Sequence, residues 1–301
     1  MTLENRQVLL NRKNIKKSLR EKEWWFSYLF DESQQLYFGW FFFRTLVTDH
    51  FNFICFDTKN NRQWLFEKNI MLDKPDRNDN LDLRYTTKKR KISFTETGPG
   101  EKEFNFSDDK YNINLQVETG DVPPFTKFEN NFTNKFGLKH TFKNRVKGSL
   151  DFEGSKFSVD TDYSYLDHCF GRVPSKAGWH WIAVQNSEIS LASLINYGAD
   201  SQRYTQVFYK NKWTRLDQNV AFEYPPEKGR KWKVTSTDMD LNVEVVALHN
   251  KIVKIPPLVP FLLDIKHDEM CVKINGKIKI GNDWITATDM YGVMEQHSGK
   301  W

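Results

Sequence analysis

Residues 111–117 read Tyr-Asn-Ile-Asn-Leu-Gln-Val, and apolar and polar side chains alternate along the whole stretch. Successive side chains of a β-strand point to opposite faces of its sheet, so this stretch presents one apolar and one polar face. Similar alternation recurs at 157–165 and at 241–245. Antiparallel strands with one face on a core and the other in water show this pattern. The alternation therefore predicts an antiparallel β-sheet protein.

Composition and turn-forming residues extend this prediction to the rest of the chain. Aromatic residues make up 15% of the 301 residues, and aromatic side chains favour strands. Asn275-Gly276 predicts a tight hairpin turn between two apolar runs, and residues 57–62 predict a longer hairpin loop. Only residues 3–22 suggest a helix. We expect an all-β fold of sandwich or barrel type, with a short N-terminal helix.

The length of the chain allows two β domains of medium size. The polar segment from Lys143 to Gly154 carries two glycines and is the candidate boundary between them. We therefore predict an N-terminal β domain at 1–150 and a C-terminal β domain at 151–301.

Charge and cysteine content restrict the partners and the location. The net charge of +5 comes from 44 basic and 39 acidic residues, a mixed surface that predicts no nucleic-acid partner. The basic residues at 12–22 form either a solvated segment or a weak contact with an anionic membrane surface. The three cysteines are far apart, and no apolar run reaches the length of a membrane span or a signal peptide. We expect a cytoplasmic protein.

Three stretches depart from the alternation, and such departures collect at functional sites. The first joins Glu23-Trp24-Trp25-Phe26 to residues 38–45, which are apolar on both strand faces. A strand buried on both sides explains this composition. Arg44 near its end is either a core arginine whose charge reaches water or a cation that orients an anionic group.

The second departure, at 163–172, contains Tyr165 and the adjacent pair Asp167 and His168. Neighbours in a strand point to opposite faces, so we expect that these two side chains do not pair with each other. Gly171 allows another segment to approach closely.

The third departure, at 178–185, places Trp179 and Trp181 on one strand face. The two rings form either ordinary core packing or a wall that holds an apolar ligand or stabilises a developing cation. The sequence has no P-loop, dinucleotide-binding glycine motif, nucleophile elbow or zinc-binding histidine spacing, so we expect no metal and no cofactor.

These departures, in this order, resemble motifs of the lipocalin-like family that includes the AttH-like proteins and the carotenoid hydratases. The matching motifs are Glu23-Trp24-Trp25-Phe26, Phe42-Phe43-Arg44, Tyr165-Leu166-Asp167-His168-Cys169-Phe170-Gly171, Gly178-Trp179-His180-Trp181 and Gly292-Val293-Met294-Glu295. The resemblance runs from about Glu23 to Trp301, although Cys169 and Phe170 replace the usual polar residue and Trp. It implies two lipocalin-like β units packed together, with a ligand cavity within or between them.

The resemblance also implies a hydrophobic small molecule, isoprenoid-like or polyketide-like, as the ligand. We expect a cofactor-independent hydratase, cyclase or isomerase that uses acid–base catalysis in an aromatic pocket. Asp167 would be the acid, with its pKa raised by burial, and His168 its partner or a base that acts through water. The residues expected to contact the ligand are Trp24, Trp25, Arg44, Tyr165, Trp179, Trp181 and Glu295.

Two alternatives to an enzyme stay open. The same aromatic wall suits a binding protein that holds an apolar ligand without chemistry. Asp167, Arg44 and Glu295 could instead form a structural ion network that braces the two halves.

Overall fold

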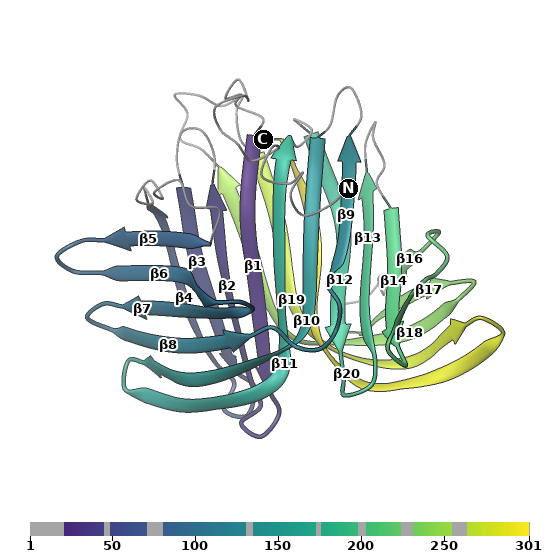
Figure 1. Cartoon of the computed structure of the whole chain (residues 1–301), viewed down its shortest axis with the longest axis horizontal. Helices are drawn as coiled ribbons and strands as arrows, with labels where there is room; N and C mark the ends of the chain where they lie inside the picture. The colour runs from purple at the N-terminus through teal and green to yellow at the C-terminus, as the bar shows by residue number, and fades with distance from the viewer. Residues whose placement is uncertain are drawn as a thin grey trace.

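Two antiparallel sheets make up the regular structure (Figure 1). The computed structural model describes residues 21–44, 49–70, 81–130, 135–172, 176–197, 203–223, 231–254 and 264–300. Within these ranges every regular element is a β-strand, so the prediction of an all-β fold is confirmed. The helix expected at 3–22 lies outside the described residues, apart from Glu21 and Lys22, which begin the first strand.

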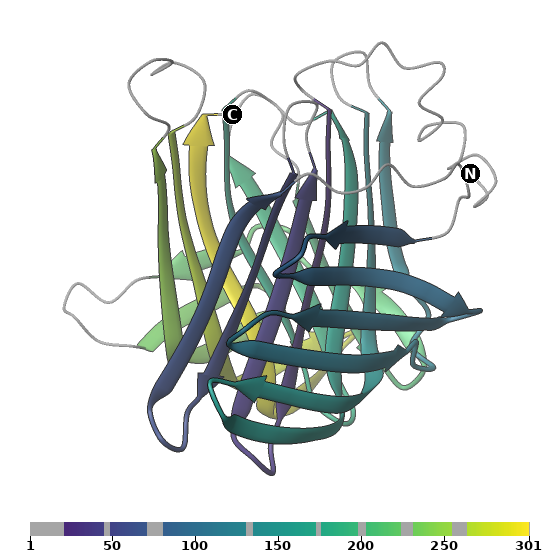
Figure 2. The ribbon, with the colours of Figure 1, turned by 90° about the vertical axis from the view of Figure 1, so that its left-hand side faces the viewer.

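The first sheet has eleven strands in the order β4-β3-β2-β1-β11-β10-β8-β7-β6-β5, with β9 beside β10. Its strands are β1 (Glu21–Asp31), β2 (Leu36–Arg44), β3 (Asp49–Asp57), β4 (Arg62–Ile70), β5 (Asp82–Thr86), β6 (Lys91–Gly98), β7 (Glu101–Ser107), β8 (Tyr111–Glu118), β9 (Phe125–Asn130), β10 (Lys135–Phe152) and β11 (Ser155–Arg172). The short strands β5–β8 cross in front of the long strands β1–β4 in Figure 2, so the sheet curls around its own core.

The second sheet has nine strands in the order β15-β14-β13-β12-β20-β19-β18-β17-β16. Its strands are β12 (Lys176–Gln185), β13 (Ser190–Tyr197), β14 (Arg203–Tyr209), β15 (Lys212–Arg215), β16 (Ala221–Glu223), β17 (Lys231–Ser236), β18 (Met239–Lys254), β19 (Asp264–Ile280) and β20 (Asp283–Lys300).

The two sheets repeat one topology. In the first, β1–β4 form a meander, and the last strand, β11, returns to pair with β1. In the second, β12–β15 form the meander, and the last strand, β20, returns to pair with β12. In each sheet the two longest strands form a hairpin, β10–β11 in the first sheet and β19–β20 in the second. This repeat matches the two lipocalin-like units that the sequence motifs imply.

Each sheet encloses its own apolar core. The core of the first sheet contains many buried aromatic rings, among them Phe38, Trp40, Phe42, Phe104 and Phe152. The core of the second sheet is aliphatic, with valine, isoleucine, leucine and methionine side chains. Side chains therefore fill the inside of each unit.

A third apolar layer lies between the sheets, and we call it the seam. It forms where β1, β2, β10 and β11 of the first sheet face β12, β14, β19 and β20 of the second. Two phenols bridge the seam by donating to backbone carbonyls: Tyr28 Oη to Ala183 O at 3.1 Å and Tyr37 Oη to Val272 O at 2.8 Å. Strand β2 packs one face in the first core and the other in the seam, so the prediction of a strand buried on both sides is confirmed.

The hairpin turn predicted at Asn275-Gly276 is wrong, because both residues lie inside the continuous strand β19. Gly276 does not take the positive φ that such a turn needs. It is required for another reason: a Cβ at Gly276 would lie 2.2 Å from Asp240 O on the neighbouring strand β18. The tight turn falls instead at Gly281-Asn282, between β19 and β20. The longer loop expected at 57–62 does connect β3 and β4.

The segment from Lys143 to Gly154, predicted as the boundary, is not a linker. It forms the second half of β10 and the turn into β11, and β10 pairs there with both β8 and β11. The chain passes from the first sheet to the second between Arg172 and Lys176. The division into domains at 1–150 and 151–301 itself stays a prediction.

Candidate functional site

Strand alternation separates the predicted site residues into two sets on opposite faces of the first sheet. Trp25 belongs to the first core, whereas Trp24 packs in the seam. Tyr165, Trp179 and Trp181 also lie in the seam. His168 stacks on Trp25 and so faces the first core, away from Asp167. Asp167 and His168 thus point to opposite faces, as expected for neighbours in a strand.

The residues on the core side are held by local partners. The rings of Trp25 and His168 stack with centroids 4.7 Å apart and an interplanar angle of 7°. His168 Nε2 lies 3.1 Å from Glu23 Oε1. Arg44 Nε lies 3.5 Å from Asp49 Oδ1 on the adjacent strand. Arg44 therefore pairs with Asp49 on the core side of the first sheet. Asp167 and Glu295 lie on the opposite side, in the seam.

Asp167 is the most enclosed carboxyl of the predicted set, with 7% of its surface exposed. It sits on β11 between Phe26 of β1 and His140 of β10. Burial raises the pKa of Asp167 to about 7, and the Cys169 thiol, which donates to Asp167 Oδ1 at 2.9 Å, offsets part of that rise. A large fraction of the Asp167 carboxyls is therefore protonated near neutral pH, and a general acid must be protonated to act.

Glu295 presents a second carboxyl to the seam from β20. Burial raises the pKa of Glu295 to about 8, and repulsion from Glu269 adds to the rise, while the indole N–H of Trp179, which donates at 3.0 Å, opposes it. Asp167 also contributes to the raised pKa of Glu295, so the two acids interact although they come from different sheets. The seam therefore brings together two carboxyls that are mainly neutral or near half-protonation at neutral pH.

A hydrogen-bonded chain of three rings lies beside Asp167. His140 Nδ1 bonds to the Tyr165 hydroxyl, and His140 Nε2 lies 3.1 Å from the Tyr204 hydroxyl. Burial lowers the pKa of His140 to about 3, so the imidazole is neutral. A neutral imidazole has one donor and one acceptor nitrogen, so one phenol donates to His140 and the other accepts from it. The chain connects β10 and β11 of the first sheet to β14 of the second.

His140 and Tyr204 are site residues that sequence reasoning missed. His140 occurs in a stretch with no motif, and its alternation with Leu138 and Phe142 was the available signal for a seam-facing position. Tyr204 comes from a strand far along the chain, and no local pattern relates it to Asp167.

Aromatic rings pack closely around these polar groups. The Trp181 ring lies 5.9 Å from Phe26, edge to face, and 5.5 Å from Tyr165. Beside them, a cavity of about 10 Å³ is lined by residues that include Glu269 and Cys271, which is room for about one water. The rings that were expected to line an aromatic pocket thus contact one another. Trp24 and Trp179 are only partly buried, so they mark the more accessible end of the seam.

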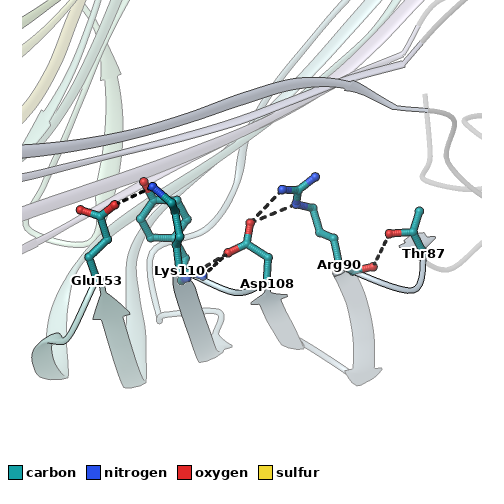
Figure 3. Close-up of polar contacts among 6 residues, drawn as sticks. Thr87, Arg90, Asp108, Lys110 and Glu153 are labelled. Atoms are coloured by element: carbon teal, nitrogen blue, oxygen red, sulfur yellow. Dashed lines mark hydrogen bonds and ion pairs between the residues drawn. The ribbon is translucent and has the colours of Figure 1, made fainter.

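A larger surface depression lies at the far ends of β7, β8, β10 and β11, outside the seam. Its volume is about 460 Å³, and Asp108, Lys110 and Glu153 lie along it. Local ion pairs hold these groups: Asp108 with Arg90 at 2.9 Å and Glu153 with Lys110 at 3.1 Å (Figure 3). Asp108 also accepts from the backbone N–H groups of Lys110 and Tyr111. The charged side chains of this depression therefore stabilise the turns in which they lie. The seam is the better candidate site.

Three further features concern the described parts of the chain. No group of three or more His, Cys, Asp and Glu residues there is arranged to hold a metal ion. No helix there is long and apolar enough to cross a membrane. The cysteines Cys55, Cys169 and Cys271 are buried free thiols.

Two solved structures share this fold. A candidate AttH protein (NE1406) from Nitrosomonas europaea shares 13% identity, with a TM-score of 0.66 and 92% of each chain covered. Kievitone hydratase from Nectria haematococca shares 12% identity, also with a TM-score of 0.66, over 95% of this chain and 90% of that one.

At these identities the likeness shows the fold, and it confirms the lipocalin-like resemblance seen in the motifs. No curated protein sequence matches the chain. The chain does match one family model over residues 4–301, and it therefore belongs to the family described as a domain of unknown function, DUF2804.

Proposed function

We propose that this protein is a cofactor-independent enzyme that protonates a carbon–carbon double bond of a hydrophobic small molecule, with Asp167 as the acid. The observation that carries the proposal is the buried carboxyl of Asp167, which has a pKa of about 7 and lies among the aromatic rings of the seam. An acid with a pKa near the working pH combines a useful protonated fraction with a real tendency to donate its proton.

The reaction begins when the Asp167 proton adds to one carbon of the double bond and leaves a cation on the other. The ring faces of Phe26, Tyr165 and Trp181 would stabilise that positive charge. Attack by water, followed by loss of one proton to the Asp167 carboxylate, completes a hydration. Attack by a second double bond of the same molecule closes a ring and moves the cation, which then loses a proton to the Asp167 carboxylate and gives a cyclised product. Loss of a different proton from the first cation to the same carboxylate gives isomerisation. The enzyme would thus be a hydratase, a cyclase or another isomerase.

The other polar groups of the seam would support this step. Glu295, oriented by the Trp179 indole, is a second carboxyl that can hold the attacking water or accept its proton. His140 fixes the Tyr165 phenol next to Asp167 and keeps this part of the site uncharged. A neutral surrounding matters because it leaves the raised pKa of Asp167 intact.

The fold comparison supports the reaction class, because one protein of the same fold is by name a hydratase. The aromatic seam also suits a second function, a binding protein for an apolar ligand such as an isoprenoid or polyketide.

The proposal is tested by identifying ligands that co-purify with the protein, using mass spectrometry, and incubating them with the protein in D₂O. We expect the wild type to place deuterium on carbon, and Asp167→Asn to lose at least about 100-fold in rate, the lower end of general-acid contributions. Asp160→Asn is the control, because this exposed aspartate lies on the same strand. Equal conversion by wild type and Asp167→Asn would remove Asp167 from its role. Saturable binding without deuterium exchange would identify a binding protein.

A further inference from the structure

The Cys169 thiol holds one oxygen of the Asp167 carboxyl. The two residues are two positions apart on β11, so their side chains point to the same face of the sheet, and both are buried, at 3% and 7% exposure. Cys169 Sγ donates to Asp167 Oδ1 at 2.9 Å. Among the residues that the structure describes, this is the only hydrogen bond that the Asp167 carboxyl receives. The contact therefore makes the two carboxyl oxygens unequal.

The surroundings of Cys169 keep its thiol a hydrogen-bond donor. Its neighbours across the sheet are Trp24 on β1 and Leu138 on β10, and the sulfur lies in the apolar layer of the seam. Burial raises the pKa of the Cys169 thiol well above its usual range, and the charges of Asp167 and Glu295 raise it further. The sulfur thus keeps its proton at and above neutral pH. The S–H group can therefore donate to Oδ1 whether Asp167 is neutral or charged.

Other polar groups from β10, β11, β14 and β20 also face Asp167. The phenols of Tyr165 and Tyr204 have pKa values raised well above the ordinary range, mainly by burial and also by the Asp167 charge. His140 is neutral because burial lowers its pKa to about 3, and burial raises the pKa of Glu295 to about 8. These groups carry little charge near pH 7. The energy of an Asp167 carboxylate in this layer therefore depends strongly on the hydrogen bond from Cys169.

We propose that Cys169 is a positioning residue that places the acid proton of Asp167 on Oδ2 and stabilises the carboxylate formed when that proton leaves. In a neutral carboxyl, one oxygen carries the proton and the other, the carbonyl oxygen, is the better acceptor. The thiol therefore favours Oδ1 as the carbonyl oxygen and Oδ2 as the oxygen that carries the proton.

The hydrogen bond from Cys169 strengthens during the proposed proton transfer. The Oδ2–H bond breaks, its electron pair stays on the Asp167 carboxylate, and the electron pair of the substrate double bond forms the new C–H bond. The S–H group then donates to a charged oxygen, and such a bond is stronger than one between neutral groups. An interaction that is stronger in the transition state than in the ground state accelerates the step.

This inference rests on the proposed function for the role of Asp167 as an acid, but the contact can be tested without a substrate. In protein labelled with ¹³C at aspartate Cγ, NMR gives the pKa of the carboxyls, and Asp167→Asn identifies the Asp167 resonance. Cys169→Ala removes the donor, and Cys169→Ser replaces S–H by O–H. Cys55→Ala is the control, because it truncates another buried thiol, in the core of the first sheet.

We expect Cys169→Ala to raise the pKa of Asp167 above its wild-type value by at least about 0.5, since the carboxylate loses a hydrogen bond. Cys169→Ser should keep this pKa at or below the wild-type value, and Cys55→Ala should leave it unchanged. An Asp167 pKa that stays the same in Cys169→Ala, or that rises as much in Cys55→Ala, would overturn the proposal.

The pH dependence of turnover distinguishes positioning from a purely structural role. Deuterium uptake should fall as the pH rises through the pKa of Asp167, because the acid loses its proton. In Cys169→Ala this fall should occur at higher pH, while the rate at lower pH drops by at least about twofold, because a weaker acid donates its proton more slowly. Cys169→Ser should restore both properties. A lower rate without a shift of the pH profile would show a structural role and overturn the proposal.

A measurement on the wild type covers the case in which Cys169→Ala does not fold. The infrared S–H stretch of Cys169 should move to lower wavenumber as Asp167 ionises, because the hydrogen bond strengthens, and Asp167→Asn should abolish this movement. An S–H stretch that does not change with pH would contradict the contact. Absence of turnover by the wild type would overturn the proposed function together with the catalytic part of this inference. Normal turnover with an unmoved Asp167 titration in Cys169→Ala would overturn the role of Cys169 alone.

Discussion

Asp167 and Glu295 occupy the same position in the two repeats of the fold. Asp167, on the last strand of the first sheet, pairs with Phe26 on the first strand, and Glu295 pairs with Trp181 in the same way in the second sheet. The strand before each acid contributes a polar partner, His140 beside Asp167 and Glu269 beside Glu295. Because the sheets pack face to face through these strands, the repeat brings both carboxyls into one desolvated layer, where each has a raised pKa.

The raised pKa of Asp167 predicts how stability depends on pH. The pKa rises from 3.8 to about 7 on folding, so between those values the folded state binds more protons than the unfolded state. The free energy of unfolding should then fall as the pH rises from about 4 to 7, by up to about 4 kcal/mol from this group at 1.36 kcal/mol per unit. Asp167→Asn should remove this part of the slope in urea denaturation at pH 4.5, 6 and 7.5. A slope equal to that of the wild type would contradict the buried neutral acid, and Asp160→Asn, at an exposed position of the same strand, is the control.

The Tyr204 hydroxyl joins the two sheets through His140, so Tyr204→Phe should be destabilising. The substitution leaves the Nε2 side of a fully buried imidazole without this partner, which typically costs about 1–3 kcal/mol. The free energy of unfolding from urea denaturation gives the value. Tyr209→Phe, on the same strand and only half-buried, should change it by less than about 0.5 kcal/mol. Equal changes in the free energy of unfolding for the two substitutions would show that the hydrogen bond to His140 does not stabilise the fold.

Gly276→Ala should destabilise the second sheet strongly. The new Cβ would lie 2.2 Å from the Asp240 carbonyl oxygen, and backbone atoms of two paired strands must move to relieve the contact. We expect a loss of more than about 2 kcal/mol in the free energy of unfolding, in the range of overpacked cores. Gly39→Ala is the matched control, because its Cβ would meet neighbours only at 3.5 Å or more. A melting temperature that falls no further for Gly276→Ala than for Gly39→Ala would show that β18 can shift freely.

The two ion pairs in Figure 3 should differ in their contribution to stability. Arg90 and Asp108 are mostly buried, at 18% and 3% side-chain exposure, and Arg90 also lies 4.6 Å from the centre of the Phe66 ring. Lys110 and Glu153 are 60% and 46% exposed, so water and salt screen their attraction.

Arg90→Ala should therefore cost about 3 kcal/mol or more, since it leaves the Asp108 carboxylate buried without its cation. Lys110→Ala should cost less than about 1 kcal/mol and become neutral at high salt. Thermal denaturation of both variants at low and at high salt concentration measures the two losses of stability. Similar losses for both variants would argue against burial as the source of the difference.

The sequence by itself determined several of the strands and, within them, the face to which the side chains point. Alternation of side chains is a property of the extended backbone, so residues 111–117 predicted β8, and neighbouring positions predicted that Asp167 and His168 face apart. The apolar composition of residues 38–45 predicted a strand buried on both faces for the same local reason. Asn275-Gly276 misled because the close approach of β18 is a contact between segments far apart in the chain.

Only the tertiary structure decided which residues meet. The encounter of Asp167 with Glu295 and the insertion of His140 between Tyr165 and Tyr204 both require two sheets to pack face to face. Such contacts join strands separated by tens to hundreds of residues, and no local pattern encodes their pairing. The same packing removes water from the seam, and the loss of water is what moves the pKa values of these acids and bases away from their ordinary range.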